Sequence, residues 1–132
     1  MAILQSYIKH FDYKELFRFL IGGGSAVITD CAVYYLLLWF GIGTAESKLC
    51  GFVTGSLVGF IINRSWTFKS HGEVPVQLIK YALLYICSAF FNTVTNEITI
   101  KYTSVIWFAF LVATGVSTVI NYLGQKYFVF RK

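Results

Sequence analysis

Charged residues are scarce in this chain, and their scarcity excludes most ordinary protein classes. Only 13% of the 132 residues are charged and 57% are apolar, whereas soluble domains average about 25% charged and about 45–50% apolar residues. A domain of this length still needs a polar shell, which seventeen charged residues gathered at a few places do not supply. A chain this hydrophobic is not intrinsically disordered either. The composition therefore indicates an integral membrane protein.

Residues that carry chemistry of their own are also few. The three cysteines, Cys31, Cys50 and Cys87, are dispersed through apolar runs, so they predict small buried side chains rather than disulfides or metal ligands. There is no glycine-rich phosphate loop and no set of nucleophile, base and orienting residue. His10 and His71 fall in expected loops. We therefore expect no enzyme, no cofactor and no metal.

Four apolar stretches are long enough to cross a bilayer, which takes about 20 helical residues. They cover about residues 16–40, 48–68, 78–100 and 105–128, separated by breaks at 41–44, 70–75 and 101–104. Their apolar runs are continuous rather than alternating, which favours helices over barrel strands. Short breaks make neighbouring helices antiparallel. The predicted fold is a single all-α transmembrane domain of four helices over residues 1–132.

Basic residues are distributed unevenly around these helices. Nine are predicted at one membrane face, namely Lys9, Lys14, Arg18, Arg64, Lys69, Lys80, Lys126, Arg131 and Lys132. Only Lys48 and Lys101 are predicted at the other face. Because cytoplasmic segments carry the excess of Lys and Arg, both termini are expected in the cytoplasm. Residues 1–15 mix charged and apolar side chains, which predicts an interfacial helix rather than a cleavable signal peptide.

The second half of the chain repeats the polar residues of the first half at an ungapped offset of 62 positions. The matched residues are Arg18 with Lys80, Asp30 with Asn92, Asn63-Arg64 with Gln125-Lys126, Trp66 with Phe128, Phe68 with Phe130, and Gly51, Gly55 and Gly59 with Ala113, Ser117 and Asn121. Such matches are informative because polar residues are scarce here. We interpret them as two hairpin repeats of the same topology, about 16–69 and 78–131, with a site at their interface.

Four basic residues occupy matched positions at the predicted cytoplasmic ends of the helices. Arg18 and Lys80 begin the first helix of each repeat, and Arg64 and Lys126 lie near the end of the second. One interpretation is ordinary positive-inside anchoring with snorkelling side chains. The other is a ring of cations that binds an anionic lipid phosphate.

Asp30 is the most informative single residue. It lies near the predicted bilayer midplane, where a charge costs roughly 3 kcal/mol or more. Its repeat mate Asn92 is polar as well. The pair predicts either a structural hydrogen bond between helices or a polar station in a transport path, to which Asn63 and Asn121 would also contribute.

Glycines and aromatic residues form two further patterns. Small residues four apart favour close helix packing, and the three glycines at 22–24 predict either tight packing or local unwinding. The aromatic residues suit belts at the two membrane faces. The predicted outer belt comprises Tyr34, Tyr35, Trp39, Phe40, Tyr102, Trp107 and Phe108, and the inner belt comprises Trp66, Phe68, Tyr81, Tyr127, Phe128 and Phe130.

Three motifs carry a family resemblance. Residues 17–24 read FRFLIGGG, residues 59–68 read GFIINRSWTF, and residues 121–130 read NYLGQKYFVF. Over about residues 16–131 the chain resembles the GtrA-like family of small four-helix membrane proteins, and the Asn-Arg-x-Trp-x-Phe ending is the most specific element. The second copy departs from this ending, since Gln125 and Lys126 replace Asn and Arg.

The resemblance implies flipping of a polyprenyl-phosphate-linked monosaccharide, such as undecaprenyl-phosphate glucose, across the bacterial inner membrane. The sugar would then decorate O antigen, teichoic acid or another glycan, and a separate membrane glycosyltransferase would make the substrate. No nucleic-acid partner is expected. Four helices make a small pathway, so a homo-oligomer is a further expectation.

Two rival functions remain. A non-transporting scaffold could recruit a polyprenyl-phosphate glycosyltransferase to the membrane. A small proton-coupled efflux pump also has four helices and an acidic residue in the first. Those pumps usually show balanced charge and a glutamate, and this chain shows neither.

Overall fold

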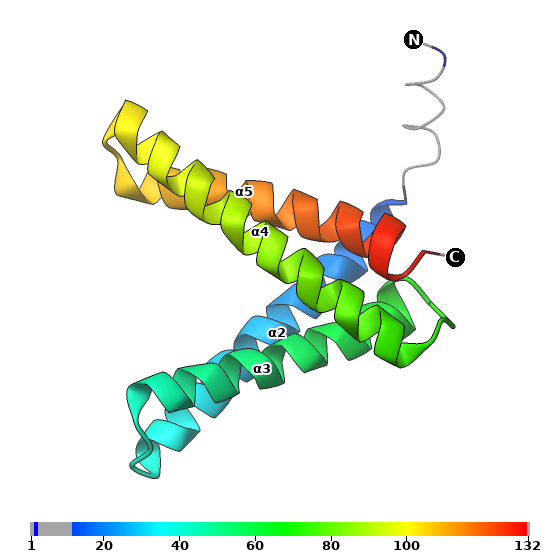
Figure 1. Ribbon diagram of the computed structural model, residues 1–132, viewed down its shortest axis with the longest axis horizontal. Helices are drawn as coiled ribbons and strands as arrows, with labels where there is room; N and C mark the ends of the chain where they lie inside the picture. The colour runs from blue at the N-terminus through cyan, green and yellow to red at the C-terminus, as the bar shows by residue number, and fades with distance from the viewer. Residues whose placement is uncertain (1, 3–11, 132) are drawn as a thin grey trace. The chain divides into compact units, whose positions relative to one another are not determined.

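The computed structural model describes Ala2 and residues 12–131, and all the regular elements in them are helical. In chain order these are α2 (Tyr13–Trp39), α3 (Thr44–Ile62), η1 (Asn63–Thr67), α4 (Val74–Thr103), α5 (Ile106–Gly124) and η2 (Gln125–Val129), where η denotes a π-helical turn (Figure 1). The predicted all-α class is confirmed. Of the predicted interfacial helix at 1–15, residues 1 and 3–11 lie outside the described residues.

Among the described residues, four helical segments are long and apolar enough to cross a membrane. They are Tyr13–Trp39, Thr44–Thr67, Val74–Thr103 and Ile106–Val129. The shortest has 24 residues, which is about 36 Å of helix and exceeds the ~30 Å of a bilayer core. Each span satisfies its own backbone hydrogen bonds, as lipid requires. The chain is a multi-pass membrane protein.

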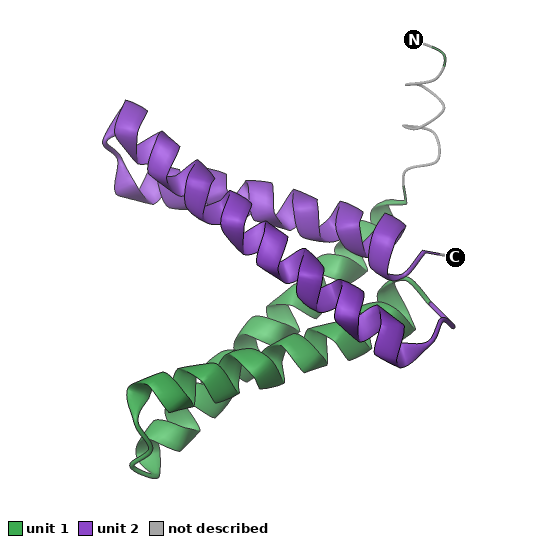
Figure 2. Cartoon of the chain, in the orientation of Figure 1, with its two compact units in different colours: residues 1–69 green, residues 70–132 purple. Residues whose placement is uncertain are grey.

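The chain divides into two compact units, residues 1–69 and 70–132 (Figure 2). Unit 1 contains α2, α3 and η1, and unit 2 contains α4, α5 and η2. Each unit is a helical hairpin whose two long helices lie side by side. The division falls between the two stretches that repeat in the sequence.

Local signals explain where the helices of unit 1 begin and end. The Asp12 carboxylate caps α2, accepting hydrogen bonds from the backbone N–H groups of Lys14 and Glu15 at 2.9 and 3.1 Å. After α2, Gly41 turns the chain with a φ of +85°, which favours glycine. Helix α3 begins at Thr44.

Two glycines of α3 bring it very close to α2. A methyl group at Gly51 would lie 2.5 Å from Asp30 Oδ1, and one at Gly55 would meet the carbonyl oxygen of Ala26. The predicted packing role is thus confirmed for these two positions. Helix α2 continues through residues 22–24, so the alternative of local unwinding at the three glycines is wrong.

Unit 2 begins with a polar turn. Gln77 Nε2 donates a hydrogen bond to Ser70 Oγ at 2.6 Å, and Pro75 occupies the first turn of α4, where its missing N–H costs nothing. The helix ends at Thr103, and the following residue, Ser104, has a left-handed conformation with a φ of +58°. The predicted break at 101–104 is therefore too early, since residues 101–103 form the last turn of α4. A 30-residue helix exceeds the hydrocarbon core, so polar residues extend it into the interface.

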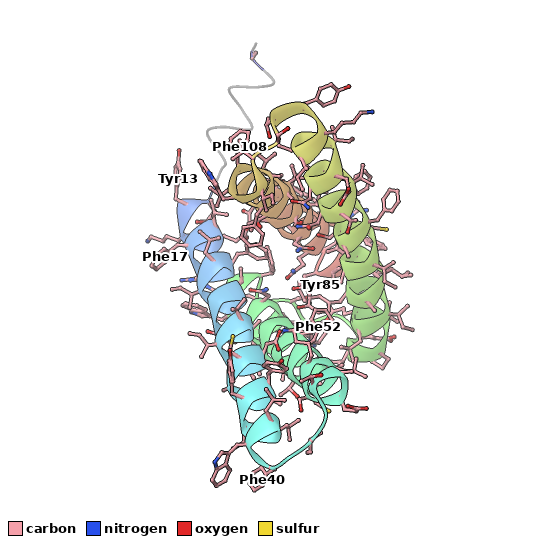
Figure 3. All side chains as sticks on the ribbon, turned by 90° about the vertical axis from the view of Figure 1, so that its left-hand side faces the viewer. Tyr13, Phe17, Phe40, Phe52, Tyr85 and Phe108 are labelled. Atoms are coloured by element: carbon pink, nitrogen blue, oxygen red, sulfur yellow. The ribbon has the colours of Figure 1, made fainter. Side chains whose placement is uncertain are left out.

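Several exposed aromatic side chains lie at the helix ends, where an interfacial belt would place them. Tyr13 and Phe17 project outward at the start of α2 and Phe40 at its end (Figure 3). Trp39 and Tyr102 are 79% and 80% exposed. The predicted outer-belt residues at these two hairpin tips are thus exposed, and the belt itself stays a prediction.

Three aromatics of the predicted inner belt are instead buried, namely Phe68, Tyr81 and Phe130. Phe68 packs on the ring of Phe19 with centroids 6.3 Å apart, and the Tyr81 hydroxyl donates a hydrogen bond to Tyr85 at 3.0 Å. The belt interpretation is wrong for these three because tertiary packing encloses them.

The three cysteines are exposed rather than buried, so the expectation for Cys31, Cys50 and Cys87 is wrong. Lipid tails solvate an apolar side chain as well as a protein core does. An apolar residue in a membrane span therefore need not face another helix.

Candidate functional site

Each hairpin ends in one π-helical turn, and the two turns occupy positions 62 residues apart. In η1 the Phe68 N–H donates to the Asn63 carbonyl, and in η2 the Phe130 N–H donates to the Gln125 carbonyl, both at 2.8 Å. π-Helical turns are rare and occur frequently at functional sites. The Asn-Arg-x-Trp-x-Phe ending singled out in the sequence is the η1 turn itself.

In unit 1 the η1 turn places an aromatic ring against a cation of α2. The Arg18 guanidinium carbon lies 5.5 Å from the centroid of the Trp66 ring, which is cation–π geometry. Arg18 is half-buried, and Trp66 keeps 39% of its surface exposed. The cation is held in place while part of the site stays open.

Unit 2 repeats this contact with different residue types. Lys80 Nζ lies 5.3 Å from the centroid of the Phe128 ring. Both residues are the repeat mates of Arg18 and Trp66. Lysine thus replaces arginine and phenylalanine replaces tryptophan, but the contact between a cation and an aromatic ring is kept.

The other two predicted cations belong to the π turns. Arg64 and Lys126 are each the second residue of their turn, and both are half-buried. Lys126 Nζ lies 5.6 Å from the ring centroids of Tyr122 and of Tyr127. Each unit therefore carries two half-buried cations at its π-helical end.

A buried amide opens each π turn. Asn63 is 2% exposed, its Oδ1 accepts a hydrogen bond from Thr67 Oγ1 at 2.8 Å, and a methyl at Gly22 would lie 2.5 Å from that same oxygen. Its mate Gln125 is 0% exposed. The sequence predicted Asn63 for the polar path but not Gln125. The repeat offset, which matches Gln125 with Asn63, is the signal that could have identified it.

Asp30 has a partner that the sequence analysis missed. Lys48 Nζ donates to Asp30 Oδ2 at 2.6 Å, and the Lys48 side chain is 59% exposed while that of Asp30 is 17% exposed. The other oxygen, Oδ1, is buried without a hydrogen-bond partner. Lys48 was predicted to serve only as an outer-face charge. Its pairing depends on the register between α2 and α3, which residue spacing does not reveal.

Asn92 contacts the matching positions of the second hairpin. Its Nδ2 donates to Ser117 Oγ at 2.6 Å and to the Ala113 carbonyl at 3.2 Å. These two residues are the mates of Gly55 and Gly51, against which Asp30 packs. The predicted hydrogen bond between helices is confirmed for Asn92. Asn121 lies on α5, as Ser117 does, and its Oδ1 is buried with no hydrogen-bond partner.

The family model of the GtrA/DPMS transmembrane domain matches residues 18–130. The chain belongs to the GtrA/DPMS transmembrane domain family. The match begins at Arg18 and ends at Phe130, so it includes both π turns and both cation–ring contacts. Membership connects the protein with the handling of polyprenyl-phosphate-linked sugars.

The two hairpins of this GtrA/DPMS domain exchange a large and a small residue at one contact. In unit 1, Gly22 of α2 faces Ile62, whose Cγ2 would lie 3.3 Å from an added methyl. In unit 2, Leu84 of α4 lies directly against Gly124. The small residue thus changes helix between repeats while the contact is kept, which is what complementary packing requires.

The GtrA/DPMS domain brings its predicted residues together in two groups within each unit. The cations gather at the π-helical end, and Asp30 or Asn92 lies twelve residues further along the first helix, about 18 Å away. Among the described residues, no three His, Cys, Asp or Glu side chains could hold a metal ion. Side chains of the types gathered here can bind an anion and form hydrogen bonds with hydroxyl groups.

Proposed function

We propose that this protein translocates a polyprenyl-phosphate-linked monosaccharide, such as undecaprenyl-phosphate glucose, across the bacterial inner membrane. The sugar would serve glycosylation of a cell-surface polysaccharide. A separate membrane glycosyltransferase would supply the loaded carrier at the cytoplasmic face, where both termini lie in this proposal. In this proposal the protein itself catalyses no chemical step.

The observation that carries the proposal is the repeated contact of a half-buried cation with an aromatic ring. Arg18 on Trp66 and Lys80 on Phe128 are held by packing before any ligand arrives. A preorganised guanidinium or ammonium binds a phosphate with less loss of side-chain entropy. Ordinary positive-inside anchoring needs charge near the interface, but it does not need the same stacked geometry twice.

In this proposal Arg18, Arg64, Lys80 and Lys126 bind the carrier phosphate. The polar groups deeper in the helices, Asp30, Asn63, Asn92 and Asn121, contact the sugar or the phosphate in transit. The polyprenyl chain stays in lipid. Asn121 supports this role, since its buried Oδ1 has no partner in the described structure and is available as an acceptor.

The test is transport of labelled polyprenyl-phosphate sugar into the lumen of proteoliposomes that contain the purified protein. The double variant Arg18→Ala plus Lys80→Ala should lose most of the transport. The matched control is Lys14→Ala plus Lys101→Ala, which removes the same charge from the same two helices but leaves both rings occupied. Equal transport by wild type and the Arg18/Lys80 variant would exclude the proposed phosphate contacts.

The same experiment distinguishes the rival functions. A pure protein that moves no lipid but co-purifies with a glycosyltransferase would be a scaffold. Export of a cationic dye that depends on a proton gradient and is lost in Asp30→Asn would identify an efflux pump. Either outcome contradicts the proposal.

A further inference from the structure

Unit 1 contains another fixed cation, in the half of the hairpin remote from Arg18. Lys48 Nζ donates a 2.6 Å hydrogen bond to Asp30 Oδ2. Asp30 lies twelve residues after Arg18, so the two cationic centres are about 18 Å apart along α2. That distance is more than half of the ~30 Å hydrocarbon core.

The ammonium of Lys48 is held by Asp30 but keeps hydrogen-bond donors for a further ligand. An ammonium has three donors, one of which goes to Asp30, and the side chain is 59% exposed. Nζ also lies 5.9 Å from the centroid of the Tyr34 ring. A cation beside an aromatic ring therefore occurs in both halves of this hairpin.

Asp30 is held in place from its other side. Its Oδ1 is buried and lies where a side chain at Gly51 would otherwise stand. The carboxylate is therefore fixed by α3 and keeps Lys48 in one position. Unit 2 has Asn92 and Phe110 at the matching positions, which form no such charge pair.

We propose that Lys48, positioned by Asp30 and Tyr34, is a second binding station for the phosphate group of the lipid carrier. The inference rests on the proposed transport function. A phosphate in hydrocarbon without a counter-charge is strongly unfavourable, and a station in each half shortens the uncompensated path. Asp30 weakens the hold of Lys48 on a phosphate, because the pair is neutral overall, and so permits release.

The alternative is that the ion pair only ties α2 to α3. The two roles predict opposite effects of Asp30→Asn on phosphate binding. If the pair is only a tether, Asp30→Asn and Lys48→Gln act alike. If Lys48 binds phosphate, Asp30→Asn frees the ammonium and strengthens phosphate binding, whereas Lys48→Gln weakens phosphate binding. Asn is also the residue that unit 2 has at this position, so helix packing tolerates it.

The experiment uses the full chain in nanodiscs and a short-chain polyprenyl phosphate with a diazirine on its first isoprene unit. After irradiation, the labelled peptides are mapped. We expect two labelled regions, one around Arg18 and Trp66 and one around Tyr34 and Lys48. In the neutral double variant Asp30→Asn plus Lys48→Gln the second region should lose label about fivefold, as for one exposed charge contact.

The single variant Asp30→Asn should raise labelling of the region around Lys48 about two- to fivefold on the same basis. Lys101→Gln is the matched control, because it removes an exposed lysine from the last turn of α4, and should change neither region. Thermal unfolding of each variant in detergent verifies that it is folded. The double variant leaves no unpaired charge, so its fold is the safest to compare.

Three results would contradict the proposal that Lys48 is a second binding station. Loss of label in Asp30→Asn equal to that in Lys48→Gln would make the pair a tether. Equal labelling of this region by phosphatidylglycerol with a diazirine near its headgroup would make it a surface for any phospholipid. Labelling of the Arg18 region alone would contradict the station but keep the proposed function, whereas absence of label from both regions would contradict the phosphate contacts themselves.

Discussion

Gly22 of α2 lies directly against the side chain of Asn63, so closely that a methyl group at Gly22 would be 2.5 Å from Asn63 Oδ1. That oxygen already accepts the hydrogen bond of Thr67 Oγ1 across the π turn. The absence of a side chain at one position of α2 thus maintains the geometry of η1. The ring that stacks on Arg18 belongs to the same turn.

We therefore expect Gly22→Ala to destabilise the protein by about 1–3 kcal/mol, the usual cost of overpacking. The next residue is its control, because a methyl at Gly23 meets no atom within 4 Å. Gly23→Ala should leave stability unchanged or raise it by up to about 1 kcal/mol through helix propensity. Thermal unfolding in detergent compares the two variants. Equal changes in stability would show that the Asn63 side chain moves away from the added methyl group at no cost.

The Arg18–Trp66 contact predicts which replacements of Trp66 are tolerated. Trp66→Phe reproduces the residue at the matching position of unit 2, so transport in proteoliposomes should fall no more than about twofold. Trp66→Leu keeps an apolar side chain but removes the ring, and the lost cation–π interaction of about 0.5–2 kcal/mol should reduce transport about two- to thirtyfold. Equal transport by both variants would show that the ring only fills space.

Leu84 and Gly124 should be coupled energetically. Gly124→Ala places a methyl against the Leu84 side chain and should cost about 1–3 kcal/mol by overpacking. Leu84→Ala alone leaves a cavity at a residue that is 8% exposed. The double variant should be more stable than the sum of the single effects predicts, with a coupling of about 0.5–3 kcal/mol. Additive effects in thermal unfolding would contradict direct packing.

The Asp30–Lys48 pair predicts an asymmetry in stability. Lys48→Met leaves a mostly buried carboxylate without its counter-charge, which is the costly way to break an ion pair. Asp30→Asn leaves Lys48 without its partner, but the Lys48 side chain is 59% exposed and can extend its ammonium toward the interface. Unfolding temperatures should therefore fall more for Lys48→Met than for Asp30→Asn, and the double variant should recover part of the loss. The reverse order would show that Lys48 is the charge that depends on the pair.

Much of the candidate site was visible in the sequence because polar residues are scarce and repeat at one offset. Arg18, Lys80, Asp30 and Asn92 stood out for that reason, and the structure places the members of each pair against matching positions of their own hairpins. Lys48 did not stand out, because Phe110 occupies its matching position and the offset gives no signal there.

The sequence also could not separate buried from exposed side chains within a span. Apolar residues on every side of a helix are compatible with lipid, so Cys31 and Phe68 carry the same signal although one is exposed and the other buried. In a soluble helix the polar face would have made that distinction.

The sequence by itself determined that this is a membrane protein of four helices with a duplicated pattern and a family resemblance. The physical reason is that lipid demands long apolar stretches whose backbone closes its own hydrogen bonds. Only the tertiary structure decided which side chains meet across each hairpin. The close approach at Gly51 and Gly55 sets the register that pairs Asp30 with Lys48. The π turn η1 places Trp66 against Arg18, and a π turn cannot be predicted from the periodicity of the sequence.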